Sequence, residues 1–337
     1  MKNKKNIITN ILFFTILIIV TYYIIFKDYN FKEIIYNLKE LNYNYLLLAF
    51  IFMILYFFVE SLNIKLILNS FKEKISIFKS FIYTLICFFF SAVTPGGSGG
   101  QPVTIYYLSK EKIKVSHSTL AYLLQLLGYN VSAIILGITF AISYNRILDK
   151  NSIILFIIGS LLILIPISLT MIGIFSKKIT KFLVNLVIKI LTKLKVKKVD
   201  TIKERIDKEL VVFNDSSKYI MTHKKEFLRS LLLSLLQLTI NYSIPYFIYR
   251  AFGLNEFDFL FILGLQAILH NATVSLPLPG AVGITETVFL MIYSSIYPPH
   301  FIHSSLLVNR LITFYLFVIL SLIVFIIKET ILKRQNK

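Results

Sequence analysis

The chain has 337 residues, of which 56% are hydrophobic and only 16% are charged, and its formal net charge is +19. So few charged side chains cannot cover the surface of an ordinary soluble protein, and the composition therefore predicts an integral membrane protein. The positive charge does not by itself indicate nucleic-acid binding, because the lysines gather in the loops between apolar segments.

Six apolar segments are long enough to cross a bilayer as helices, since about 20 residues span the hydrocarbon core. The first is longer than the apolar core of a secretory signal, and no small-residue cleavage site follows it before Lys27, so we expect it to be retained. Loops rich in lysine are expected on the cytoplasmic side, which places both termini there. The six segments are residues 7–26, 45–64, 118–144, 151–176, 230–249 and 301–327.

Residues 80–108 form a further apolar segment, which is interrupted by glycines and flanked by basic loops on both sides. Both loops are expected in the cytoplasm, so the segment has to turn back inside the membrane. Its two arms would rise about 22 Å and about 12 Å, which is short of a hydrocarbon core about 30 Å thick. The sequence TPGGSGGQP, from Thr94 to Pro102, therefore predicts the tip of a re-entrant hairpin, because glycine permits a tight turn and close backbone approach.

The spacing Pro-Gly-x-x-Gly occurs at residues 95–99 and again at residues 279–283, the second time between apolar arms at 257–276 and 285–297. The charges of the flanking loops predict that the second hairpin enters from the outer face. Two broken elements of opposite orientation indicate an inverted repeat, whose tips meet near the midplane and form a transport site. We therefore predict an all-α polytopic membrane protein with about six spanning helices and two oppositely oriented re-entrant helical hairpins.

Residues 177–226 are the only substantial polar stretch, and we expect them to be a cytoplasmic amphipathic helical insertion in a single integral membrane domain over residues 1–337. Apolar residues recur at helical spacing from Ile179 to Leu194, with lysines between them, as in a helix that lies on an anionic membrane surface. A second helix with mixed charges is predicted for residues 201–213. A helical hairpin on the membrane explains this composition better than nucleic-acid binding does.

Arg310 lies nine residues into the last apolar segment, too deep to reach the interface easily, and could meet an anion. The alternative is a structural ion pair with an acid such as Glu286 or Glu60. Glycines before a helix N-terminus also favour an anion, although a hairpin packed against its neighbours needs no ligand. Glu60 and Lys65 are expected to be interfacial anchors, and His270 and Asn271 to be helix-packing groups. The sequence predicts no catalytic residue, cofactor or metal.

The segments TPGGSGGQPVTIYYLSKEKI and PLPGAVGITETVF, together with the late Arg310, resemble the lysylphosphatidylglycerol synthase transmembrane (flippase) domain family. This family includes the membrane half of the multiple peptide resistance factor, and the present chain is similar to its short stand-alone form. The resemblance implies a multi-pass protein of the bacterial cytoplasmic (inner) membrane that handles phospholipid. It also implies movement of aminoacylated phosphatidylglycerol to the outer leaflet, and thereby resistance to cationic antimicrobial peptides.

Two functions of different class compete. The first is lipid translocation, in which an anionic or aminoacylated phospholipid meets the glycine tips and Arg310. The second is the lysyltransferase activity in the family name, or a non-transporting subunit beside a separate soluble transferase; only ten residues follow Ile327, which favours translocation. No nucleic-acid partner is expected, and the oligomeric state stays open. The expected substrate-binding residues are Gly96, Gly97, Gly99, Gly100, Gln101, Pro279, Gly280, Gly283, Glu286 and Arg310.

Overall fold

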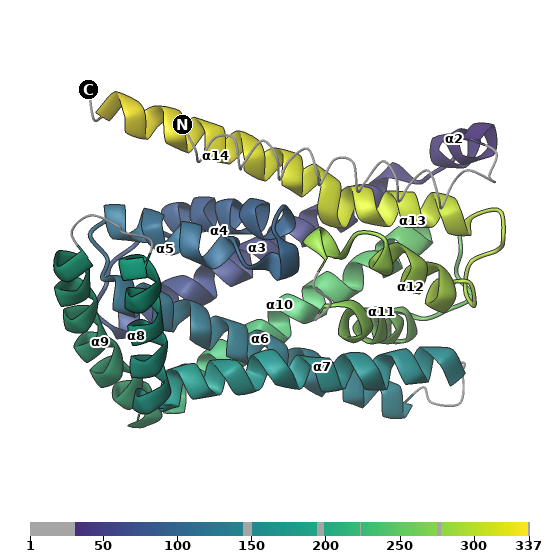
Figure 1. The fold of residues 1–337 in the computed structure, drawn as a ribbon. Helices are drawn as coiled ribbons and strands as arrows, with labels where there is room; N and C mark the ends of the chain where they lie inside the picture. The colour runs from purple at the N-terminus through teal and green to yellow at the C-terminus, as the bar shows by residue number, and fades with distance from the viewer. Residues whose placement is uncertain (1–30, 144–149, 194–198, 223, 275–277, 336–337) are drawn as a thin grey trace.

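The computed structural model describes residues 31–143, 150–193, 199–222, 224–274 and 278–335, and their regular structure is entirely helical (Figure 1). The elements are α2 (Phe31–Lys39), α3 (Tyr43–Ser70), α4 (Ile77–Ala92), η1 (Pro95–Gly97), α5 (Gly100–Lys110), α6 (Val115–Ser143), α7 (Lys150–Phe175), α8 (Lys177–Lys193), α9 (Val199–Thr222), α10 (Lys224–Ala251), α11 (Phe259–Thr273), η2 (Pro279–Ala281), α12 (Ile284–Tyr293), α13 (Ile302–Arg310), η3 (Leu311–Tyr315) and α14 (Leu316–Gln335).

Five stretches of the described residues are long and apolar enough to cross a membrane. They lie in α3, α6, α7, α10 and the continuous run α13–η3–α14, and they coincide with five of the six predicted spans. The predicted first span, residues 7–26, lies outside the described residues. The prediction of an all-α polytopic membrane protein is confirmed.

Small polar residues allow the central helices to approach one another closely. Gly128 of α6 lies against Ser234 of α10, where an added Cβ would be 3.1 Å from the hydroxyl oxygen. Ser80 of α4 donates a hydrogen bond of 2.8 Å to the backbone carbonyl of Ser61 in α3. Such small residues are typical of packed membrane helices, because lipid provides no hydrophobic force that holds the helices together.

The helix α3 extends six residues beyond the predicted apolar segment and ends at Ser70. Its end is set by a backbone turn in which Lys72 has a positive φ of 64°, and not by the point at which apolar residues stop. Glu60 therefore lies ten residues before the end of the helix, or about 15 Å along its axis. Lys65 lies closer to the helix end, and the expectation that both residues are interfacial anchors stays a prediction.

The helices α4 and α5 form an antiparallel pair whose outer ends are held together. Lys79 at the start of α4 forms an ion pair of 2.6 Å with Glu111, which follows α5, and Tyr83 donates a hydrogen bond of 2.6 Å to the same carboxylate. Partial burial alone would raise the pKa of Glu111, but the hydrogen bonds from Lys79 and Tyr83 and the charges of Lys79 and Lys328 lower it below its ordinary value. The start of α4 and the end of α5 therefore lie side by side at one end of the molecule.

The helices α11 and α12 form a second pair, with both outer ends packed around Tyr249 of α10. The rings of Phe257 and Tyr297 lie 6.3 Å and 5.5 Å from the ring of Tyr249. In Figure 1 the first pair lies in the left half of the molecule and the second pair in the right half, and the turns η1 and η2 lie against each other between them. This arrangement agrees with opposite orientations, while re-entry into a bilayer stays a prediction.

Cysteine labelling tests the topology of the first pair. In a background that carries Cys87→Ser, single cysteines in place of Lys74 and Lys112, both exposed, should be blocked only by reagents that reach the cytoplasm. The physical reason is that the flanking loops are both basic and are joined by the Lys79–Glu111 ion pair. Labelling of the two positions from opposite sides of the membrane would contradict the hairpin.

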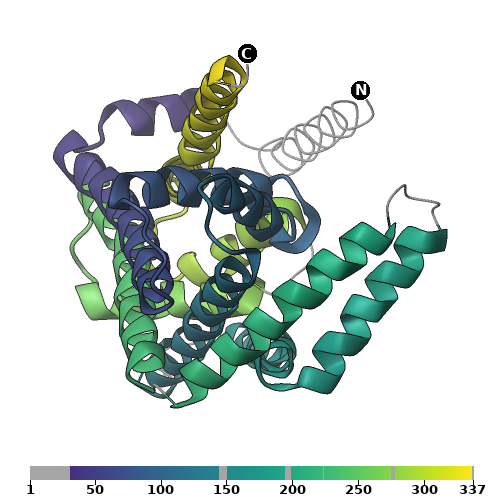
Figure 2. The same ribbon diagram turned by 90° about the vertical axis from the view of Figure 1, so that its left-hand side faces the viewer.

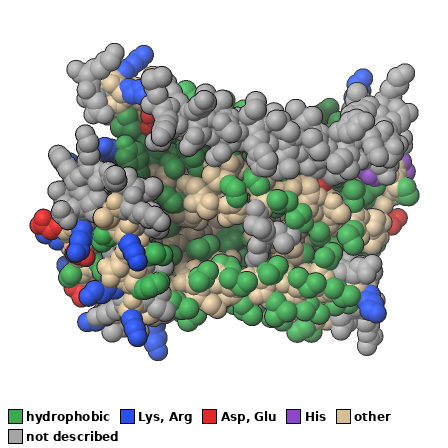
Figure 3. All heavy atoms as spheres, in the orientation of Figure 1, with side chains coloured by type: hydrophobic (Ala, Val, Ile, Leu, Met, Phe, Trp, Pro, Cys, Tyr) green, Lys and Arg blue, Asp and Glu red, His purple; other side chains and the backbone are tan. Residues whose placement is uncertain are grey.

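The predicted insertion is built from α8 and α9, which project from the helix bundle as a helical hairpin (Figure 2). The helix α9 is longer than predicted and ends at Thr222. Figure 3 shows lysine and arginine side chains gathered at the end of the molecule formed by these helices, whereas hydrophobic side chains dominate the face beside it. A cytoplasmic location of this end stays a prediction.

Candidate functional site

The two Pro-Gly turns have nearly the same backbone conformation. Gly96 has φ 59° and ψ 22°, and Gly280 has φ 58° and ψ 14°. The residue that follows each glycine also has a positive φ, which is 68° at Gly97 and 49° at Ala281. A left-handed conformation is costly for residues other than glycine, so two consecutive left-handed residues are an unusual feature. Its presence in both turns indicates that the sequence repeat is also a structural repeat.

The correspondence ends at the last glycine of each motif. Gly99 has a φ of −87°, which any residue can adopt, whereas Gly283 has a φ of 91°. The helix α12 begins directly after Gly283, and Glu286 in its first turn accepts a hydrogen bond of 2.6 Å from the Gly283 backbone N–H. The second turn is therefore closed by a carboxylate, as is common at helix N-termini.

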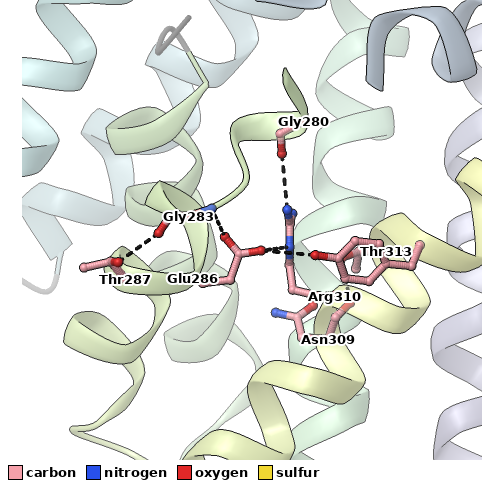
Figure 4. A network of polar contacts seen from close by, with 8 residues as sticks. Gly280, Gly283, Glu286, Thr287, Asn309, Arg310 and Thr313 are labelled. Carbon is pink, nitrogen blue, oxygen red and sulfur yellow. Dashed lines mark hydrogen bonds and ion pairs between the residues drawn. The ribbon is translucent and has the colours of Figure 1, made fainter. Parts of the chain in front are cut away.

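Arg310 reaches this carboxylate from the end of α13 (Figure 4). Its Nε lies 2.7 Å from Glu286 Oε1, and the side chains of Arg310 and Glu286 are 8% and 0% exposed. Arg310 Nη2 also donates a hydrogen bond of 3.2 Å to the backbone carbonyl of Gly280. The ion pair thus bridges a helix end and an irregular turn, and of the two acids considered from the sequence it is Glu286 that pairs with Arg310.

Two aromatic rings cover the guanidinium group. Arg310 Cζ lies 4.5 Å from the ring centre of Phe314 and 5.6 Å from that of Tyr315, and the Tyr315 hydroxyl lies 3.5 Å from Glu286 Oε1. Phe314 and Tyr315 are the last two residues of the wide π-helical turn η3, which begins directly after Arg310. A wide turn brings side chains four and five positions apart onto the same face, so both rings reach Arg310. Such cation–π contacts stabilise a cation away from water.

The turn η1 packs against this site from the other pair of helices. Phe89, Ala92 and Val93 at the end of α4 form one buried cluster with Val282 and Phe314. The structure thus brings the predicted residues Pro279, Gly280, Gly283, Glu286 and Arg310 together, and it places Gly96, Gly97, Gly99, Gly100 and Gln101 in the neighbouring turn and the start of α5. Their role in binding a lipid stays a prediction.

Gly100 lies at a close contact between α5 and α4. A Cβ atom at this position would lie 2.5 Å from the backbone oxygen of Cys87 and 2.1 Å from Ser91 Oγ. Gly100→Ala is therefore expected to lower the free energy of unfolding by about 1–3 kcal/mol, because a backbone atom cannot move aside easily. Thermal or denaturant unfolding of the purified protein measures this.

The matched control for Gly100→Ala is Gly173→Ala in α7, where an added Cβ would meet no atom within 4 Å. Because alanine is a better helix former than glycine, this control should leave stability unchanged or raise it by up to about 1 kcal/mol. Equal stability of the two variants would contradict the close packing of α4 and α5.

An apolar cavity of about 440 Å³ lies beside the second turn, between α7 and α12. A second cavity, of about 650 Å³, lies at the basic end of the molecule, after α3. The first is lined by Ile154, Leu155, Gly283, Ile284, Thr287, Val288 and Met291. The second is lined by Lys65, Asn69, Lys72, Glu73, Lys74, Ile75 and Ser76.

Sequence reasoning missed Phe314 and Tyr315, because they reach Arg310 only through the π-helical turn, and no residue pattern marks such a turn. It also missed Gln237, whose side chain is fully buried against Glu60. Gln237 could have been found from the sequence, because it is a polar residue inside an apolar span. The prediction that Asn271 packs helices agrees with its hydrogen bond of 3.0 Å to the backbone of Ala133 in α6.

Comparison with known proteins adds two findings. Residues 7–321 match the family described as the lysylphosphatidylglycerol synthase TM region. The chain is also similar to a UPF0104 membrane protein of Archaeoglobus fulgidus, with 27% identity over 266 residues that cover 76% of this chain and 77% of that protein. The family match includes both Pro-Gly turns and Arg310.

Proposed function

The chain belongs to the lysylphosphatidylglycerol synthase TM region family, and on this premise we propose that it moves phospholipid between the two leaflets of the membrane. The observation that carries the proposal is the buried ion pair of Arg310 and Glu286 at the meeting point of two Pro-Gly turns. Charged groups inside membrane helices are costly and usually mark a substrate path. Irregular backbone at this depth also requires a protein or aqueous surrounding.

In the proposed mechanism Arg310 and Glu286 neutralise each other while no lipid is bound. A lipid phosphate that enters the site replaces Glu286 as the partner of Arg310. The phosphate oxygens then accept the hydrogen bonds that the guanidinium N–H groups donate to Glu286 and to the Gly280 carbonyl in the empty site. The neutral pair keeps the empty site stable in a medium of low dielectric. In this exchange Glu286 keeps its hydrogen bond from the Gly283 N–H, and the ammonium group of an aminoacylated headgroup would balance the charge that Arg310 no longer compensates.

The apolar cavity beside Gly283 suits the other half of a lipid. Its side chains are mostly aliphatic, and it adjoins the turn that holds the ion pair. An acyl chain in this cavity would place the phosphate of the same molecule near Arg310. This combination of an apolar pocket with a few converging polar groups is the usual form of a small-molecule site.

We further propose that the protein acts in the cytoplasmic membrane, with both termini in the cytoplasm, and that the moved lipid is anionic or aminoacylated. Aminoacylated lipid in the outer leaflet would contribute to resistance to cationic antimicrobial peptides. The alternative is the transferase chemistry in the family name, or a non-transporting subunit that assists a separate soluble transferase. The carboxylate of Glu286 is held by Arg310 and by the Gly283 N–H, so the arrangement supports binding of a charged headgroup better than activation of a nucleophile.

Reconstituted vesicles test the proposal. A fluorescent anionic phospholipid should exchange between leaflets several times faster with the protein than in empty vesicles. The double variant Glu286→Gln with Arg310→Gln, which keeps both side chains polar and removes both charges, should fold and lose most of this exchange. Lys189→Gln, at an exposed position on α8, is the control and should exchange lipid normally. Normal exchange by the folded double variant would reject the site.

The same vesicles separate the alternatives. If the protein forms lysyl lipid when given lysyl-tRNA and phosphatidylglycerol, the transferase alternative replaces the translocator. If neither exchange nor product is seen in folded protein, the subunit alternative is favoured and the proposed function is rejected.

A further inference from the structure

A second ionisable group, Glu60, lies inside the helix bundle and takes no part in the contacts of the Arg310–Glu286 pair. It follows the midpoint of the 28-residue helix α3, which is one of the apolar spans. Its Oε2 accepts a hydrogen bond of 3.1 Å from Gln237 Nε2 in α10. Among the ion pairs formed by described residues, none includes Glu60. The basic side chains in these pairs all contact other carboxylates.

The groups around Glu60 have spare acceptors. Gln237 and Asn63 are both fully buried, and the amide oxygens Gln237 Oε1 and Asn63 Oδ1 have no hydrogen-bond partner. The amide nitrogen of Asn63 is already used, since it donates to the Ser230 carbonyl at 3.2 Å and to Ser234 Oγ at 3.3 Å. Asn63 is three residues after Glu60 on the same helix face, and Gln237 is three residues after Ser234. A carboxylate and two unpartnered carbonyl oxygens therefore occur along one seam between α3 and α10.

The ionisable side chains that face Glu60 do not supply a positive charge. Those that interact with it electrostatically are phenols and a thiol: Tyr56 on its own helix, Cys87 on α4, and Tyr122 and Tyr129 on α6. Beyond them, His270 of α11 lies with its ring 5.6 Å from the ring of Tyr129. Within the described part of the chain, the carboxylate of Glu60 thus has one hydrogen-bond donor, Gln237, and phenol and thiol neighbours, but no fixed cation.

We propose that Glu60 is the anionic centre of a site for one monovalent cation inside the membrane, either a proton on its carboxyl group or an alkali ion shared with the amide oxygens. A single carboxylate balances one positive charge, whereas a divalent ion would leave an excess. Oxygen atoms of carboxylates and amides are the ligands that hard cations prefer. Glu60 is partly exposed in the structure. This site is separate from the Arg310–Glu286 pair, and its occupancy does not require lipid movement.

Two measurements on the purified full-length protein distinguish the two cations. If a proton is bound, the infrared band of a protonated carboxyl group should appear in the wild type and disappear in Glu60→Gln. If an alkali ion is bound, the midpoint of thermal unfolding should rise with sodium that replaces choline at constant ionic strength, and Glu60→Gln should lose this rise. Glu256→Gln, which changes an exposed carboxylate between α10 and α11, is the control and should behave like the wild type in both.

Either positive result supports the site and identifies the ion. An ionised Glu60 whose protein shows no specific response to sodium, potassium or lithium would overturn it. If Glu60→Gln does not fold, Glu60→Asp keeps the carboxyl group and moves it by one methylene. That variant should shift the infrared band or weaken the sodium response, and an unchanged band and response would also overturn the proposal.

Discussion

Replacing Arg310 with glutamine is expected to lower the free energy of unfolding by about 3–5 kcal/mol, because the fully buried Glu286 would keep its charge and lose its partner. The Gly280 carbonyl would lose a donor in the same step, and the rings of Phe314 and Tyr315 would lose the cation beside them. Denaturant unfolding of the purified variant measures the loss.

A double-mutant cycle separates the pair from its parts. Glu286→Gln alone should also be strongly destabilising, because it strands Arg310 and replaces the carboxylate that accepts the Gly283 N–H. The double variant should recover much of the loss, since no uncompensated charge remains. Additive losses in the double variant would show that the two side chains do not act as a pair.

The surface pair of Arg229 and Glu226 provides the control for this cycle. Its nitrogen–oxygen distance is 3.0 Å, close to that of the buried pair, but the Arg229 side chain is 40% exposed. Arg229→Gln should therefore cost less than about 1 kcal/mol. A comparable cost at the two arginines would mean that burial does not govern the effect.

Gly280→Ala is expected to have the second large effect, with a loss of roughly 2–5 kcal/mol from strain at positive φ and from overpacking. The added Cβ would lie 2.2 Å from Cζ of Phe314, and the φ of 58° is unfavourable for alanine. The ring cannot move freely, because it is buried against Phe89 and Val282 and lies over Arg310. Displacement of the ring should disturb the ion pair, so lipid exchange should fall together with stability.

Gly253→Ala separates the two causes. Gly253 has a φ of 75°, but an added Cβ there would meet no atom within 4 Å. This variant should show only the conformational cost, about 1–2 kcal/mol, and normal lipid exchange. If Gly280→Ala lowers the free energy of unfolding by no more than Gly253→Ala does, the contact with Phe314 does not contribute to the loss of stability.

Much of the fold follows from the sequence because its determinants are local. Apolar length identified five spanning stretches, and the repeated Pro-Gly spacing identified both turns. The partner of Arg310 could not be chosen from the sequence, because Glu60 and Glu286 are both acids in or beside apolar segments. That choice depends on which helix faces meet. The contact of Glu60 with Gln237 was not predicted for the same reason, since it depends on which faces of α3 and α10 meet.

The contacts of the ion pair have a consequence for the second turn. A surface loop satisfies its free backbone groups with water, which the interior of a bilayer lacks. Here Arg310 donates to the Gly280 carbonyl, and Glu286 accepts from the Gly283 N–H, so two side chains take the places that two solvent molecules would occupy. The pair therefore satisfies backbone groups of the turn that water would otherwise satisfy. Any event that separates Arg310 from Glu286 also puts the hydrogen bonds of the Gly280 carbonyl and the Gly283 N–H at risk.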